Sequence, residues 1–412
     1  MLDILLIAVL LVALVNTNQS IARKFGVPEE YKNHLNYLLF YHFFFSLFYT
    51  YYILNFGGDS WGYWEFTMEQ VVVKDPTWMK YFGVSTTFIL WVNYIPSKIF
   101  GLAYITGNIL YGFLGFIGIR YLFVMTCKHF PTNYKFLNIA VFPTIFYLPN
   151  MHFWSSGVGK DALCFWGIAW FVFAIQNYKE RWWQGAIALF FVYYARPHMG
   201  LAMLGGATMA IILDSEIKRQ YKFALFFLTM GGAIYFSDQT LMFLGMEDFS
   251  FESIELLAES QIEFLNRGRV GSAVDLASYS LPMRVFTYLY RPLFFDAHNF
   301  VAFVSSFENL FYLFFTFFLL RNFSLEAFRD APVFLKASIF MFIPVTFAFA
   351  SSLSNMGITM RMKNMTIIYL ILFIFYLMVY KKKIRFIRHK ANVDFMKEKL
   401  AARGKKKENT EA

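Results

Sequence analysis

Ionisable side chains in this sequence gather in a few short stretches at the ends of long apolar runs. The stretch "HFWSSGVGKDAL" at 152–163 holds Lys160 and Asp161, and "ARPHMG" at 195–200 holds Arg196 and His198. Ionisable groups at membrane depth normally face a polar cavity or a partner. Cations beside such short connections therefore indicate a site for an anionic ligand.

The glycines and lysine of the first stretch do not form an ATP-binding loop. A P-loop has a glycine five residues before its Gly-Lys pair and a Ser or Thr after the lysine. Here Trp154 stands five residues before Gly159, and Asp161 follows Lys160. We expect Asp161 to cap the helix that follows, since a carboxylate complements free amides at a helix N-terminus. Lys160 opposes that dipole, so either a neighbouring carboxylate or a bound phosphate must compensate it, unless it is a snorkelling side chain.

Further cations occur in "NRGRVG" at 266–271, "YRPLFFDAHN" at 290–299 and "GITMRMKN" at 357–364. We predict that these cations share one anionic ligand, and that Arg196, Arg291, Arg361 and Lys160 converge on one outward-open cavity. The alternative is that each one anchors the chain at the membrane interface. The predicted substrate-binding set is Lys160, Arg196, Arg267, Arg269, Arg284, Arg291, His298, Arg361 and Lys363.

An acidic stretch, "GGDSWGYW" at 57–64, lies on the same predicted side. Its aromatic residues beside Asp59 suit either a membrane-interface belt or a platform on which a sugar ring stacks while the carboxylate accepts from its hydroxyls. A serine nucleophile at Ser155 or Ser156 lacks an identifiable triad. No pair of histidines or carboxylates has a compact metal-ligand spacing, so no metal site is predicted.

The elements that position these residues are membrane helices. Hydrophobic residues make up 58% of the 412 residues and aromatic residues 22%, and the mean hydropathy is +0.47, which excludes a soluble domain. We predict an all-α, polytopic integral membrane protein with about 11 transmembrane helices and short amphipathic extracytoplasmic helices. The apolar stretch 82–97 is expected along the membrane surface. The predicted spans are roughly 1–15, 35–55, 102–120, 136–150, 161–177, 184–196, 199–213, 221–238, 299–320, 334–353 and 366–380.

The predicted organisation is one transmembrane domain, 1–380, followed by a basic cytoplasmic tail, 381–412. Twelve Lys or Arg residues lie in that tail, directly after an apolar span, which indicates attraction to an anionic membrane leaflet and not to nucleic acid. Alternation then places the N-terminus outside, together with extracytoplasmic loops 56–101 and 239–298. The second loop contains an acidic amphipathic stretch, about 251–265, expected as a helix that covers the membrane domain.

Five of these stretches together resemble a loose class of bacterial membrane proteins. They are "GGDSWGYW", "WSSGVGKDA", "RPHMG", "YRPLFFDAHN" before a span with Glu308, and "NMGITMRMKN" before the last span. The chain is similar to oligosaccharide repeat-unit (O-antigen) polymerases and related C-type glycosyltransferases of polysaccharide biosynthesis. The sequence departs from this class in two ways: it has no Asp-x-Asp pair, and its longest extracytoplasmic loop, 239–298, is of only modest length. These departures leave the identity of the catalytic base open.

The resemblance implies transfer of a glycan from a polyprenyl-pyrophosphate carrier to a sugar hydroxyl at the outer face of the bacterial inner membrane. Asp59 or Asp161 would orient or deprotonate the acceptor, with His198 as a further candidate base, while the arginines and Lys160 would hold the pyrophosphate. No cofactor is required, and a divalent metal stays open. The implied partners are the polyprenyl-linked glycan, membrane lipids and other polysaccharide-assembly proteins.

Three alternatives remain at this stage. A transporter or flippase for a lipid-linked or anionic solute would also need cations in a cavity, although no internal repeat is visible. A membrane acyltransferase would use His198 or His298 as its base. A purely structural subunit is disfavoured, because charges at membrane depth are costly without a ligand or partner.

Overall fold

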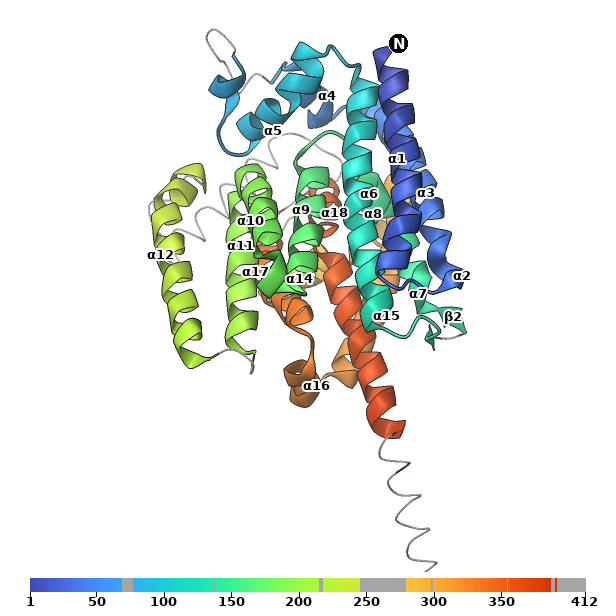
Figure 1. Ribbon diagram of the computed structural model, residues 1–412, viewed down its shortest axis with the longest axis vertical. Helices are drawn as coiled ribbons and strands as arrows, with labels where there is room; N and C mark the ends of the chain where they lie inside the picture. Colours follow the sequence, from blue (N-terminus) through green and yellow to red (C-terminus); the bar gives the residue numbers. More distant parts are fainter. Residues whose placement is uncertain are drawn as a thin grey trace, which may run out of the picture.

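The chain folds into a helical bundle (Figure 1). The computed structural model describes residues 1–68, 77–136, 138–214, 218–244, 279–297, 299–353, 355–386 and 390. Its first half consists of α1 (Leu2–Lys24), α2 (Glu29–Lys32), α3 (His34–Phe56), α4 (Asp59–Glu65), η1 (Trp78–Tyr81), α5 (Thr86–Asn93), η2 (Tyr94–Ile99), α6 (Tyr104–His129), β1 (Lys135–Phe136), β2 (Ile139–Ala140), α7 (Val141–Thr144), η3 (Ile145–Tyr147), α8 (Pro149–Trp154) and α9 (Lys160–Ile175). Its second half consists of α10 (Tyr178–Ala195), α11 (Pro197–Ile212), α12 (Arg219–Leu244), α14 (Leu281–Tyr290), η4 (Phe294–Asp296), α15 (Phe300–Asn322), α16 (Leu325–Asp330), α17 (Val333–Ser352), α18 (Met356–Lys363) and a final helix, Ile367–Phe386.

Several helices have the length and composition of membrane spans, as the apolar sequence predicts. Among the described residues five qualify, namely Leu2–Lys24, Glu29–Phe56, Tyr104–His129, Phe300–Asn322 and Val333–Ser352. A sixth is obtained if α18 and the final helix, bent by 54° relative to each other, count as one span. The number of about 11 is therefore not confirmed. Two of the predicted spans form helices of only 16 residues, α9 and α11, or about 24 Å at the helical rise, which is less than the thickness of a bilayer core.

The prediction of a membrane helix at 136–150 is wrong. The region forms β1 and β2, which pair antiparallel, and then the short α7 and η3. Pro143 and Pro149 explain the difference, because a proline inside a helix removes a backbone hydrogen bond and clashes with the preceding turn. Pro149 instead occupies the first position of α8, where its missing N–H costs little.

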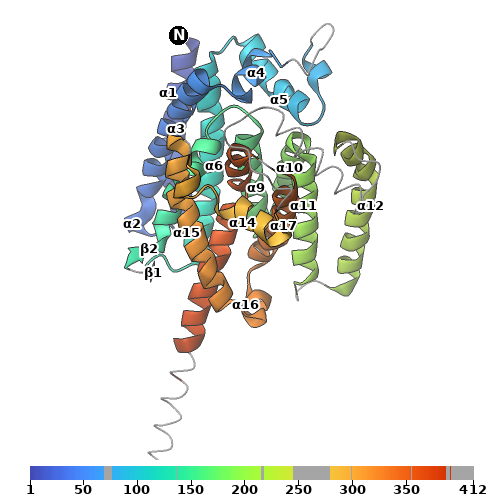
Figure 2. The same cartoon turned by 180° about the vertical axis from the view of Figure 1, so that it is seen from behind.

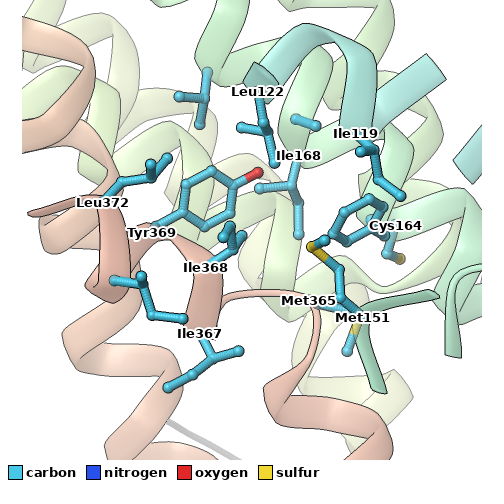
Figure 3. Packing of buried hydrophobic residues seen from close by; sticks show 14 of the residues in the cluster. Ile119, Leu122, Met151, Cys164, Ile168, Met365, Ile367, Ile368, Tyr369 and Leu372 are labelled. Atoms are coloured by element: carbon cyan, nitrogen blue, oxygen red, sulfur yellow. The ribbon is translucent and has the colours of Figure 1, made fainter. Parts of the chain in front are cut away.

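The centre of the bundle is formed by α9, which packs against α6 and α10, and by α17, which packs against α11. Figure 3 shows the core where α6 and α9 meet the final helix, with side chains from all three elements gathered in one cluster, among them Ile119, Leu122, Ile168 and Tyr369. A glycine on α6 allows this helix to pack closely against α9. A Cβ at Gly118 would lie 3.1 Å from the backbone of Trp166 on α9.

Short helices close one end of the bundle. Both views show α4 and α5 across the end at which the N-terminus lies (Figure 2). The final helix ends at the opposite end, beside α16. We call these the α4–α5 end and the tail end. The predicted amphipathic helix at 251–265 lies outside the described residues.

Candidate functional site

One carboxylate at the α4–α5 end binds two arginines. The Arg196 Nη2 atom donates to Asp161 Oδ1 at 2.6 Å, and Arg361 Nε forms an ion pair with Asp161 Oδ2. Both oxygens of Asp161 are thus engaged by guanidinium groups from elements that are distant in sequence. The side chains of Arg196 and Asp161 are each only 10% exposed. A buried carboxylate with two cationic partners is a strong, charge-assisted arrangement.

The chain reaches this point through a tightly packed turn before α9. The Val158 amide donates to Asn108 Oδ1 on α6 at 2.8 Å, and a Cβ at Gly157 would lie 2.0 Å from the Tyr49 ring on α3. Gly159 has a φ of +153°, which side chains rarely adopt. These contacts fix where α9 begins, and they place Asp161 in its first turn, as predicted. The prediction that Asp161 caps the helix is wrong, because Gly159 is the N-cap and both Asp161 oxygens face arginines instead.

A second carboxylate extends the cluster toward the surface. Arg361 Nη1 lies 3.4 Å from Asp59 Oδ2, at the start of α4. The Arg361 side chain is 23% exposed and that of Asp59 is 52% exposed. The ionic cluster of Arg196, Asp161, Arg361 and Asp59 therefore runs from a buried pair to an accessible carboxylate.

Lys160 lies beside this cluster under the closing helices. Its ammonium donates to Ser85 Oγ at 2.7 Å and to Thr86 Oγ1 at 3.1 Å, and it stands 5.7 Å from the centre of the Tyr63 ring. Burial raises the pKa of Tyr63, with Asp59 acting in the same direction, so its phenol is neutral. With Lys160 included, three cations share two carboxylates, which leaves a formal excess of one positive charge.

His198 lies near Arg196, in the first turn of α11. Its ring packs at 5.4 Å against Phe349 of α17, and within the described part of the chain neither buried ring nitrogen has a hydrogen-bond partner. The ring is not part of the ionic cluster, but a lone pair or N–H is free for a ligand.

Arg291 does not join the cluster, contrary to the prediction that it converges with Arg196, Arg361 and Lys160. Its guanidinium contacts Asp296 twice, at 2.9 and 2.6 Å, and the Tyr279 hydroxyl at 3.2 Å. Burial disfavours ionisation of Asp296, but the bonds from Arg291 and from the Leu293 amide hold its pKa below the ordinary value. Arg284 donates to the Tyr279 carbonyl at 3.0 Å. Both arginines thus stabilise the segment around α14.

Lys363, predicted to bind substrate, also lies outside the ionic cluster and forms hydrogen bonds to residues of the bundle. Its buried ammonium donates to Asn309 Oδ1 at 2.5 Å and to the carbonyls of Arg291 and Leu289 at 3.1 and 3.3 Å. An ammonium has three donors, and all three are used. Glu308 nearby accepts from the Asn150 amide at 2.7 Å and from the Tyr312 hydroxyl at 2.9 Å.

Three predicted ligand-binding residues, Arg267, Arg269 and His298, lie outside the described residues. Sequence reasoning missed Ser85, Thr86, Asn108 and Tyr49, because uncharged side chains in apolar surroundings give no signal of their own. In the described ranges no group of three His, Cys, Asp or Glu side chains is placed to hold a metal ion.

No protein-family model, curated protein or solved structure matches this chain.

Proposed function

We propose that this protein is a membrane glycosyltransferase that moves a glycan from a polyprenyl-pyrophosphate carrier to a sugar acceptor during polysaccharide biosynthesis. The observation that carries the proposal is the ionic cluster with Lys160: an excess of cationic groups, at one end of an apolar bundle, next to an accessible carboxylate. The charged pyrophosphate of a polyprenyl lipid lies at the membrane surface, and the end of an apolar bundle is expected at the same depth.

The cations supply what the departing pyrophosphate needs. The bond between the sugar's anomeric carbon and the phosphate oxygen breaks, the acceptor oxygen bonds to that carbon, and negative charge collects on the pyrophosphate. Arg196, Arg361 and Lys160, already held by their partners, would stabilise that charge with little reorganisation. The pyrophosphate is already a good leaving group, so this step needs no nucleotide.

Asp59 is the better base of the two carboxylates. Both Asp161 oxygens are occupied by arginines, so Asp161 serves to position those cations. Asp59 is half-exposed and has one long contact with Arg361, which leaves lone pairs for the proton of an acceptor hydroxyl. Trp61, which is 43% exposed in the same helix, offers a face for a sugar ring.

In this proposal α9 to α12 also lie in the membrane and, with the six spans above, make ten helical spans, while the short elements between α6 and α9 form a further crossing that is not one continuous helix. The α4–α5 end faces the outside of a bacterial inner membrane, with the N-terminus there and the tail end in the cytoplasm. Lipid-linked glycan and other polysaccharide-assembly proteins would be the partners.

The test compares lipid-linked glycans in cells with and without the protein. Accumulation of single polyprenyl-linked units on the outer face upon deletion, reversed by the wild type and not by Arg196→Ala, is the expected result. Intermediates trapped on the cytoplasmic face would instead indicate a flippase. An unchanged glycan profile would refute the proposal and direct attention to acyl transfer with His198 as base.

A further inference from the structure

A polar cavity opens at the tail end, far from the ionic cluster. Its volume is about 440 Å³, and it lies where α15 and the final helix end, closed on one side by the segment before β1. The lining residues are Tyr134, Phe318, Arg321, Asn322, Met378, Lys381, Lys382 and Arg385.

Four of these residues are cations, and among the described residues no carboxylate lines this cavity. Lys381 donates to the Arg321 carbonyl at 3.3 Å and so compensates the C-terminal end of α15. Lys382 stands 5.5 Å from the centre of the Tyr134 ring, a weak cation–π contact. Within the described residues no ion pair is formed by Arg321, Lys382 or Arg385. In the part of the chain that the structure describes, three positive charges therefore face one cavity without a carboxylate partner.

A second cavity at the tail end does not show this excess of cations over carboxylates. That cavity, of about 540 Å³, is lined by Lys179, Arg329 and Lys336 but also by Asp214 and Asp330. There the charges nearly balance, and Asp330 further accepts from the Tyr380 hydroxyl at 2.8 Å. General enrichment of cations at this end does not explain why the first cavity lacks acids.

Position and shape indicate the kind of anion. The cavity lies at the ends of two helices long and apolar enough to belong to membrane spans, and Phe318 and Met378 give it an apolar wall beside the cations. A phospholipid matches both features, because its headgroup phosphate can contact the cations while its hydrocarbon chain contacts the apolar wall. Basic pockets between membrane helices are a known mode of binding anionic lipids. We infer that this cavity binds the phosphate headgroup of an anionic phospholipid. The inference does not rest on the proposed glycosyltransferase activity.

The test titrates the purified, detergent-solubilised protein with cardiolipin, phosphatidylglycerol or phosphatidylcholine and counts bound lipids by native mass spectrometry. We expect the wild type to prefer the anionic lipids. The variant Arg321→Gln/Lys382→Gln should bind cardiolipin roughly 30-fold more weakly, since each cation near a membrane surface contributes about 1 kcal/mol. Both side chains line the surface of the cavity, and gel filtration checks that the variant is folded.

The matched control is Arg329→Gln/Lys179→Gln, which removes the same two charge types from the neighbouring cavity and should bind cardiolipin like the wild type. Equal weakening by both double variants would overturn the inference, because it would indicate a general charge effect. Inorganic phosphate that binds the lipid-free protein, and that cardiolipin does not displace, would overturn the assignment to a lipid.

Discussion

Replacement of Asp161 by asparagine should destabilise the protein more than any other single charge change at the α4–α5 end. The substitution keeps the size of the side chain but removes the charge that both Arg196 and Arg361 contact. Arg361 keeps Asp59 as a second, more distant partner. Arg196 has no other carboxylate among the described residues, so its buried guanidinium is left uncompensated.

The magnitude follows from burial. Removing one partner of a buried ion pair costs about 3–5 kcal/mol, because the remaining charge stays buried. The Arg196–Asp161 pair, with each side chain 10% exposed, belongs to that class. The Arg361–Asp59 contact, at 3.4 Å with Asp59 half-exposed, belongs to the surface class of about 0–1 kcal/mol. We therefore expect Asp161→Asn to lower the free energy of unfolding by about 3–5 kcal/mol and Asp59→Asn by no more than about 1 kcal/mol.

Reversible unfolding in mixed micelles of a mild detergent and dodecyl sulfate, followed by tryptophan fluorescence, measures both values. Adding Arg196→Met to Asp161→Asn should recover part of the loss, since an apolar side chain needs no partner at that site. Equal destabilisation by Asp161→Asn and Asp59→Asn, or no recovery in the double variant, would refute the assignment of Asp161 as the buried centre of the cluster.

Three further outcomes are expected. If the proposed function holds, Asp59→Asn abolishes glycan extension in a deletion strain while membrane insertion stays normal; near-normal polymer would remove Asp59 as the base. Gly115→Ala should cost about 1–3 kcal/mol in unfolding experiments, because its Cβ would lie 2.0 Å from the Ser155 carbonyl, whereas Gly205→Ala, which meets nothing within 4 Å, should be neutral or stabilising. Lys363→Met should cost at least about 2 kcal/mol, since three acceptors lose their donor in two buried hydrogen bonds and one partly buried one, and a smaller loss would contradict that role.

The long apolar helices could be predicted from the sequence because unbroken hydrophobic runs have few alternatives to helix. The predictions 35–55, 299–320 and 334–353 fall within a few residues of α3, α15 and α17. The same reasoning failed at 136–150, where the composition is apolar but two prolines prevent a continuous helix. Hydrophobicity thus predicts the long helices, but not the break that the two prolines introduce.

The site was predictable only in part. Lys160, Asp161 and Arg196 were recognised from local charge at helix ends, but the pairing of Asp161 with Arg361 joins residues 200 positions apart, and no local pattern predicts it. Arg291 pairs with Asp296, a carboxylate five residues downstream in the same stretch. At that spacing a local ion pair is a simpler interpretation of an arginine than a shared ligand.

Helix geometry also separates two cations that the sequence analysis had grouped. Residues two apart on a helix do not face each other, so Arg361 and Lys363 on α18 point in different directions. Arg361 reaches Asp161 and Asp59, while Lys363 points toward Asn309 on α15. One short helix therefore carries one cation for the ionic cluster and one that ties the bent segment to the bundle.

Within the proposed function, Arg361 couples donor binding to the state of the base. Its ion pair with Asp161 holds it in place. Its contact with Asp59 is long and partly exposed, and breaking that second contact costs at most about 1 kcal/mol. A phosphate oxygen offers Arg361 a stronger, charge-assisted partner than that contact. Binding of the pyrophosphate would then release Asp59 from Arg361, and a carboxylate without its cation is a better proton acceptor. The base would become available when the donor is in place.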